Sequence, residues 1–465
     1  MYDNINISLP QRILFETQHD TQMVIRMRFE VRGWKRYLAP SAIFLTLIAR
    51  FADASTVLTL PQAISEALHT QPQVFQSAHT AAASRDLARA AHAVLLPQIS
   101  LAAGNIWSES RAGTPLYVAA NAPREVIGQI QVSLPLYAPQ LYALAKVAKD
   151  QSAVALSQEK EARLVVVASV VNAYYQFDLL QTQMTIWRST LDTAQRLYRD
   201  THKAYTAGAV SDLDLIQTAL LRNKARTGLQ QTIAEAHAAM RLLNLQIGRA
   251  PDGDVVLPHR QVPDNPLPNP PILDAQAKRT QPLIQAADRQ ISVGQAQANV
   301  QRGAMLPTVS AGAAYGVDTA TAPQGNDLGW QGAVTLNMPI FGFGAHRQRI
   351  AAAQEQVAAL QSARQALILQ INSQIAHDYG AAQAAQKTLA NARRAAHEAH
   401  LVYTMTSKGY FAGAFNALNL AQAEGNWVRA RLHFSSADVA VRMTRAQLDL
   451  DMGRYPAKTT GNARS

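Results

Sequence analysis

Cysteine is absent from the 465 residues of the chain, and its absence excludes several kinds of chemistry. Without a thiol there is no disulfide, no thiolate zinc site, no cysteine nucleophile and no N-terminal lipidated cysteine. Charge is also scarce, because Asp, Glu, Lys and Arg together make up 16% of the residues, against about 25% in an ordinary soluble domain. The 48% of apolar residues argues against disorder, which requires low hydrophobicity together with high charge.

The sequence also lacks the motifs of common enzyme sites. It has no His-Glu-x-x-His, no Gly-x-Ser-x-Gly and no Gly-x-x-x-x-Gly-Lys. We therefore expect no enzyme activity, no cofactor and no metal site. The net charge of +11 hints at an anionic partner, but the basic residues are not interleaved with an aromatic stacking platform, so nucleic acid is not expected as a partner.

Long apolar runs are missing beyond residue 54, where no stretch has the roughly 18 apolar residues of a spanning helix. The N-terminal segment has the layout of an export signal. Basic residues at 32, 35 and 36 precede an apolar run at 38–49, and Ala52-Asp53-Ala54 supplies small residues for cleavage. We interpret residues 1–54 as an over-extended N-terminus plus a signal peptide, with Met27 as the better start.

The rest of the chain is a tandem duplication, in which two copies of one unit are offset by about 205 residues. We expect repeat 1 at 55–257, a Pro-rich linker at 258–271, repeat 2 at 272–455 and a disordered tail at 456–465. The matching landmarks are Thr70-Gln71-Pro72 with Thr280-Gln281-Pro282, Leu96-Pro97 with Leu306-Pro307, Tyr205 and Gly208 with Tyr410 and Gly413, and Gly248-Arg249 with Gly453-Arg454.

Each repeat contains a pair of strands. Apolar and polar residues alternate over 126–134 and 330–338, and upstream partners are expected at 97–110 and 307–318. A half-buried hairpin in a soluble sandwich has this pattern too, but ten-residue strands with almost no charge favour an outer-membrane barrel. Four strands cannot close a barrel, so copies of the chain must share one, with eight strands from two copies or twelve from three.

The remainder is expected to be helical. No Pro or Gly interrupts residues 140–207, where a heptad seam predicts a long coiled-coil helix, and a weaker seam covers 382–403. Return helices are expected to run from Gly208 to Gly248 and from Gly413 to Gly453. Shorter helices are predicted over 61–94 and 272–304.

With these features in this order twice over, residues 56–455 resemble the TolC-like outer-membrane factor family, and the missing cysteine matches its non-lipidated branch. The resemblance implies an α+β membrane protein in the outer membrane of a Gram-negative-type cell. It implies a homotrimer whose twelve-stranded β-barrel, four strands per chain, continues into a long α-helical coiled-coil periplasmic tunnel.

The function implied by the resemblance is that of a passive exit duct of a tripartite efflux pump. Its partners would be a periplasmic adaptor, an inner-membrane RND or ABC transporter, and outer-membrane lipid. Export of small molecules is favoured, with type I protein secretion as an alternative. A periplasmic coiled-coil adaptor or scaffold without a pore is the alternative from another class.

The resemblance also places a gate at the two helix turns of the periplasmic tip, where Gly208 and Gly413 face the adaptor. It pairs Asp214 with Tyr410 as a latch between neighbouring coils. The alternative is an exposed Asp near a helix start and a core Tyr. Where family members often carry acidic rings, this sequence has Asn419 and Gln422, and Phe415 replaces a basic residue. We therefore expect an aperture that is polar but uncharged.

Overall fold

The computed structural model describes residues 56–107, 110–111, 114–115, 124–258, 266–319 and 328–456. The expected signal segment at 1–54 and the tail at 457–465 lie outside these ranges, as do most of the loop at 111–124 and residues 259–265 of the linker. The chain divides at Ser55, and residues 55–465 form one compact unit.

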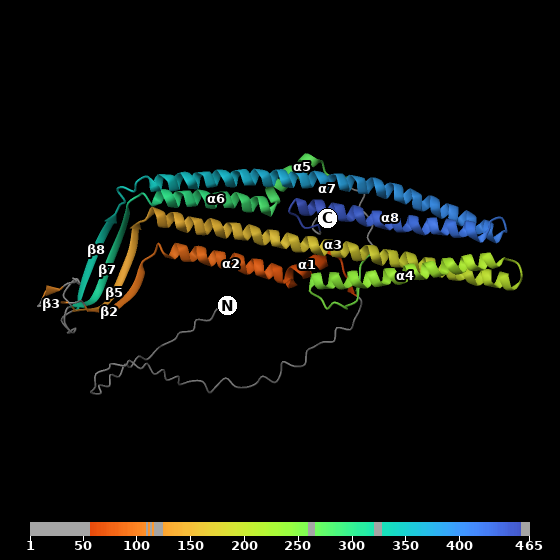
Figure 1. The fold of residues 1–465 in the computed structure, drawn as a ribbon, viewed down its shortest axis with the longest axis horizontal. Helices are drawn as coiled ribbons and strands as arrows, with labels where there is room; N and C mark the ends of the chain where they lie inside the picture. Colours follow the sequence, from red (N-terminus) through yellow and green to blue (C-terminus); the bar gives the residue numbers. More distant parts are fainter. Residues whose placement is uncertain are drawn as a thin grey trace, which may run out of the picture. The chain divides into compact units, whose positions relative to one another are not determined.

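The first repeat begins with short elements and ends with two long helices (Figure 1). Its elements are β1 (Thr56–Val57), α1 (Leu60–Thr70), α2 (Pro72–Ala93), β2 (Gln98–Trp107), β3 (Ser110–Arg111), β4 (Thr114–Pro115), β5 (Arg124–Tyr137), α3 (Pro139–Thr206), α4 (Asp212–Ile247) and β6 (Val255–Val256).

The second repeat has the same order of helices and longer strands, and among its described residues no element corresponds to the two-residue strands β1, β3, β4 and β6. Its elements are α5 (Pro270–Thr280), α6 (Pro282–Gly303), β7 (Thr308–Thr319), β8 (Gly329–Asn337), α7 (Ala345–Phe411) and α8 (Ala417–Asp451). Helix α5 begins two residues inside the expected linker. The element order therefore agrees with the duplication of landmarks in the sequence.

The prediction of one short helix before each strand pair was wrong, because the structure has two consecutive helices in each of these places. Gln71 and Gln281 are extended, with ψ of 126° and 119°, and a new helix begins at the proline that follows. Proline disfavours helical geometry in the residue before it but is well tolerated at the first position of a helix. Pro72 and Pro282 therefore end one helix and begin the next.

Helix α3 is continuous, as predicted, and so is α7, for which only a weaker seam was visible in the sequence. Helix α3 has 68 residues and α7 has 67, each about 100 Å long at 1.5 Å per residue. Along α3 the seam residues Val166, Val170, Ala173 and Phe177 are buried, and α4 packs back along the same helix. Helix α8 packs on α7 in the same way. Helix α8 also contacts α3, and this contact joins the two repeats.

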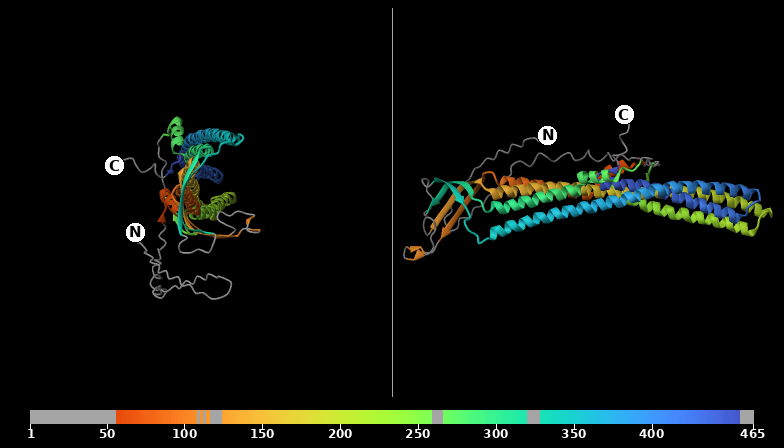
Figure 2. Two further views of the ribbon diagram at one scale, coloured as in Figure 1. Left: turned by 90° about the vertical axis from the view of Figure 1, so that its left-hand side faces the viewer. Right: turned by 90° about the horizontal axis from the view of Figure 1, so that it is seen from above.

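The four longer strands form one antiparallel sheet in the order β2-β5-β7-β8, at one end of the helices (Figure 2). The central pair, β5 with β7, brings a strand of each repeat together. Residues opposite each other in register share a face, and one face is almost wholly apolar. Across the four strands it carries Ile99, Leu101, Ile130, Val132, Ala311, Ala313, Tyr315, Trp330, Val334 and Leu336.

The opposite face of the sheet combines polar residues with small residues and with Ile106 and Ile127. Its polar residues are Ser100, Gln129, Gln131, Ser310, Asp318, Gln331 and Thr335, and Gln129 Nε2 donates to Asp318 Oδ2 (3.2 Å). The predicted alternation therefore continues in register through all four strands. Strands β2 and β8 are the two edges of this sheet.

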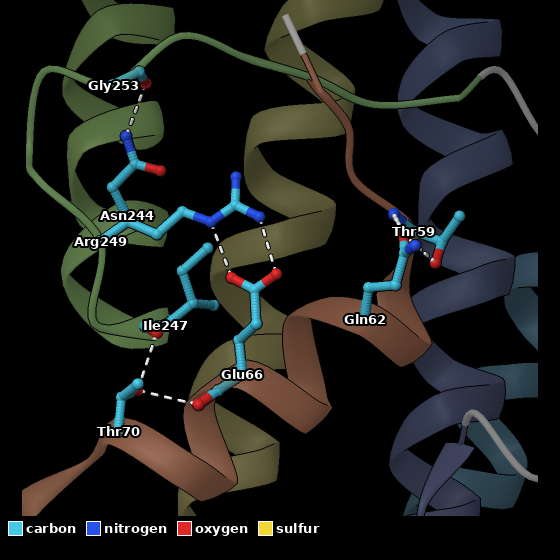
Figure 3. A network of polar contacts seen from close by, with 8 residues as sticks. All are labelled: Thr59, Gln62, Glu66, Thr70, Asn244, Ile247, Arg249 and Gly253. Atoms are coloured by element: carbon cyan, nitrogen blue, oxygen red, sulfur yellow. Dashed lines mark hydrogen bonds and ion pairs between the residues drawn. The ribbon is translucent and has the colours of Figure 1, made fainter. Parts of the chain in front are cut away.

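The Thr-Gln-Pro and Gly-Arg landmarks of each repeat meet in space. Thr70 Oγ1 donates to the carbonyl of Ile247 at the end of α4 (2.8 Å), next to the paired side chains of Glu66 and Arg249 (Figure 3). In the second repeat, Thr280 Oγ1 donates to the carbonyl of Met452. These side chains satisfy carbonyls that the last turn of a helix leaves free, so the same joint is built twice.

Candidate functional site

Two helix turns at the end of the helices remote from the sheet form the candidate site (Figure 1). In each turn a glycine has a left-handed backbone, with φ of 74° at Gly208 and 76° at Gly413. Gly208 N–H donates to Tyr205 O (2.9 Å) and Gly413 N–H to Tyr410 O (3.0 Å), so both turns close their helix in the same way. Glycine adopts this conformation without the steric penalty of a side chain.

Asp214 joins the two turns. It lies in the first turn of α4, where its Oδ2 accepts from Ser211 Oγ (2.8 Å) while Ser211 Oγ accepts from Asp214 N–H (3.2 Å). This reciprocal arrangement caps the helix start. Its second oxygen, Oδ1, accepts from the backbone N–H of Ala417 at the start of α8 (3.3 Å). The carboxylate therefore holds the first turn of α4 to that of α8.

Tyr410 lies in the last turn of α7, and its hydroxyl is 3.3 Å from Thr201 Oγ1 of α3. Within the described residues no hydrogen bond joins Asp214 to Tyr410. Each of the two side chains instead connects the first repeat to the second through a different partner. The latch between neighbouring coils concerns more than one chain and stays a prediction.

The corresponding tyrosine of the first repeat, Tyr205, has a different environment. A hydrogen bond to Asp212, together with the negative charge of that residue, raises the pKa of Tyr205. The position of Asp212 in the second repeat is Ala417. The two turns therefore share a backbone conformation but differ in charge.

The three expected aperture residues lie at the start of α8. Asn419 repeats the capping contact of Asp214 without its charge, since its Oδ1 accepts from Asn416 N–H (3.4 Å). Gln422 is exposed and lines a groove between α4 and α8 together with Gln217. Phe415 is half exposed, and its ring covers Gly409, where an added Cβ would collide with it. Their place around an aperture stays a prediction.

The sequence reasoning missed the capping residues Ser211 and Asn416, although the pattern of a capping residue three positions before Asp214 or Asn419 was a usable signal. It also missed a buried ion pair between the repeats. Arg442 of α8 donates to Asp178 of α3 (2.5 Å) and to Asp438 (2.7 Å), with 10% or less of the Arg442 and Asp178 side chains exposed. The signal for it was Asp178, a charged residue that directly follows the seam residue Phe177 in the sequence.

Neither a metal centre nor a spanning helix is found in the ranges given above. The described residues contain no group of three or more His, Asp or Glu side chains placed to hold a metal ion. Among the helices in the same ranges, none combines the length and hydropathy of a membrane-crossing segment.

Comparison with curated proteins finds outer-membrane components of Pseudomonas aeruginosa. The pyoverdine export outer membrane protein OpmQ is 27% identical over 306 residues, which are 63% of this chain and 61% of OpmQ. The outer membrane protein OprJ is 23% identical over 331 residues, or 68% of each chain. The matched stretch thus spans somewhat less than two thirds of OpmQ.

Among solved structures, the CmeC outer membrane channel of Campylobacter jejuni has a TM-score of 0.71 at 15% identity, covering 85% of each chain. This likeness shows a shared fold. The model of the outer membrane efflux protein family matches residues 63–246 and 274–454, one stretch in each repeat and well over half of the sequence. The chain belongs to the outer membrane efflux protein family.

Proposed function

We propose that three copies of this chain form a passive exit duct in the outer membrane. One observation carries the proposal, namely a sheet with one apolar face and two unpaired edges, β2 and β8. Unpaired backbone groups are prohibitively costly in lipid, and four strands are too few to close a barrel. Pairing β8 of one copy with β2 of the next removes the edges, and three copies supply twelve strands.

The helices supply the second half of the duct. Helices α3 and α7 extend about 100 Å from the strands, enough to form a periplasmic tunnel below the barrel. The turns at Gly208 and Gly413 then face a periplasmic adaptor and an inner-membrane pump, which provides the energy. The duct itself carries out no catalysis, and the relative named for pyoverdine export supports small molecules as its cargo.

Disulfide cross-linking tests the shared barrel cleanly, because the chain has no cysteine of its own. Each double variant carries one cysteine on each edge strand. The position on β2 is Ser100→Cys or Ala102→Cys, the position on β8 is Ala333→Cys or Thr335→Cys, and membranes containing the variant are oxidised. We expect a ladder on a denaturing gel that ends at three chains, because these edge strands meet only between copies.

The matched control places both cysteines on inner strands. Gln131 and Ala314 face each other between β5 and β7 of a single chain, so Gln131→Cys with Ala314→Cys should close within one chain and give no ladder. Edge variants that stay monomeric while this control closes would refute the shared barrel, as would recovery of the protein in the soluble periplasmic fraction.

A further inference from the structure

Glu424 is a buried acid without a hydrogen-bond partner. It lies on α8 two turns from the helix start, with 3% of its surface exposed, and its Oε2 makes no hydrogen bond to any described residue. Burying an unpaired polar group costs free energy, so such a group in a folded protein calls for an explanation.

A cavity of about 210 Å³ lies next to this carboxyl, between α3, α4 and α8. Its walls are mainly apolar, from Trp187, Leu221, Val428 and Leu432. The Trp187 indole packs directly on Gly228, where an added Cβ would lie 2.8 Å from the ring. A cavity of roughly 150 Å³ with apolar walls is known to hold benzene, so this one accommodates an aromatic ring with a small substituent.

The cavity has an entrance. A groove of about 500 Å³ between α4 and α8 shares Leu221, Ala421 and Gly425 with it. Gly425 leaves room at this boundary, because a Cβ added there would meet no atom within 4 Å.

The charges around Glu424 favour an anionic ligand. Lys224 of α4 and Arg429 of α8 line both the cavity and the groove, and neither forms an ion pair with Glu424 within the described residues. From α7, Tyr403 faces the same carboxyl. Burial raises the pKa of Tyr403, the charge of Glu424 adds to this, and Arg196 of α3 opposes it.

Burial also raises the pKa of Glu424 to about 7. At neutral pH about half of the group is therefore protonated, and below neutral pH most of it is, so that it carries an O–H donor rather than a negative charge. An apolar chamber with an O–H donor inside it and two cations near its entrance is complementary to an apolar body with an anionic head.

We propose that this cavity binds a small aromatic carboxylate. The ring lies against Trp187 and the apolar walls, while the carboxylate accepts a hydrogen bond from Glu424 and is attracted by Lys224 and Arg429. The walls come from α3 and α4 of the first repeat and α8 of the second, so one ligand contacts both repeats. The site is formed within one chain, so its test does not depend on the proposed duct.

Benzoate is the probe, titrated calorimetrically into the full-length protein in detergent, with Trp fluorescence as a second signal. We expect one benzoate per chain and at least tenfold weaker binding of neutral benzamide and cationic benzylamine. Replacing the indole in Trp187→Phe should remove the fluorescence change.

The pH profile identifies Glu424 as the donor. Benzoate remains ionised between pH 6 and 8, whereas the fraction of protonated Glu424 falls about tenfold, so the affinity should fall about tenfold as well. Glu424→Gln keeps a donor without a titratable proton, and its affinity should be constant over this range. A wild-type affinity that does not change with pH would overturn the assignment.

Gly425→Leu fills the boundary of the cavity and should abolish binding. Gly380→Leu is the matched control, since Gly380 lies in the middle of α7 and also has no atom within 4 Å of an added Cβ. Far-UV circular dichroism checks that both variants fold. Failure of benzoate to bind, tighter binding of benzylamine, or undiminished binding by Gly425→Leu would each refute the proposal.

Discussion

At the scale of single residues, Asp214 is the side chain that we predict to hold the tip closed. Its carboxylate accepts from Ser211 in its own helix and from Ala417 in the other repeat. Hydrogen bonds to a charged group contribute about 1.5–3 kcal/mol, enough to bias a gate without locking it. We expect Asp214→Ala to raise the conductance of the closed channel in planar bilayers.

Asp212→Ala is the control for this prediction. Asp212 has the same charge in the same helical turn, but the bond to Ala417 belongs to Asp214. Removing Asp212 therefore weakens the favourable charge at the helix start and removes the hydrogen bond to Tyr205 within the first repeat, but it leaves the connection to α8 in place. Equal closed-state conductance for Asp214→Ala and the unaltered protein would rule out a closing role.

Part of this site was predictable from sequence. The sequence located both turns through a repeated spacing. Six residues separate Gly208 from Asp214, and six separate Gly413 from Asn419. The bond between Asp214 and Ala417 was not, because it joins residues 203 positions apart and depends on how the two helical hairpins pack. The cavity beside Glu424 was equally hidden, since its walls come from three helices.

At the scale of the helices, glycines with the same backbone conformation have different surroundings. Gly248 (φ 79°) follows α4 and Gly208 (φ 74°) follows α3. A Cβ on Gly248 would collide with Thr70, whereas one on Gly208 would meet no atom within 4 Å. Gly208→Ala should therefore lower the free energy of unfolding only by the cost of a left-handed backbone at alanine, about 1–2 kcal/mol.

Gly248→Ala should cost more than Gly208→Ala, because Thr70 must move and its bond to Ile247 O is lost. Apparent melting temperatures of the two variants in the same detergent measure the difference. If the apparent melting temperatures of both variants fall by the same amount, the contact between α1 and α4 adapts to the added methyl group and Thr70 contributes little to its stability.

Helix boundaries show why sequence patterns succeeded in one place and failed in another. The absence of Pro and Gly over 140–207 predicted α3 to within a residue at each end. The same reasoning ran one helix through Pro72, although proline at a first helical position is a start signal. The chain turns there because Gln71 is extended, and its side-chain Nε2 donates to the carbonyls of Leu245 and Gln246 at the end of α4.

At the scale of the whole molecule, the two repeats are fused into one sheet and one helical assembly. The period-two pattern predicted the strands and their faces, but it did not predict that β5 would pair with β7 across the repeats. That pairing requires the repeats to pack side by side, which the Arg442–Asp178 ion pair between α8 and α3 also supports. The apolar face is continuous only because of this arrangement.

A pair of neighbouring residues on β8 tests whether the apolar face meets lipid. Val334 lies on that face with 72% of its surface exposed, and Thr335 lies on the polar face. An arginine facing lipid near the membrane midplane costs about 2–4 kcal/mol, whereas an arginine facing the lumen mainly changes selectivity. Val334→Arg should therefore reduce the amount of protein in the outer-membrane fraction, while Thr335→Arg should insert normally and shift the reversal potential toward anions. Equal recovery of both variants from the membrane would show that this face does not contact lipid.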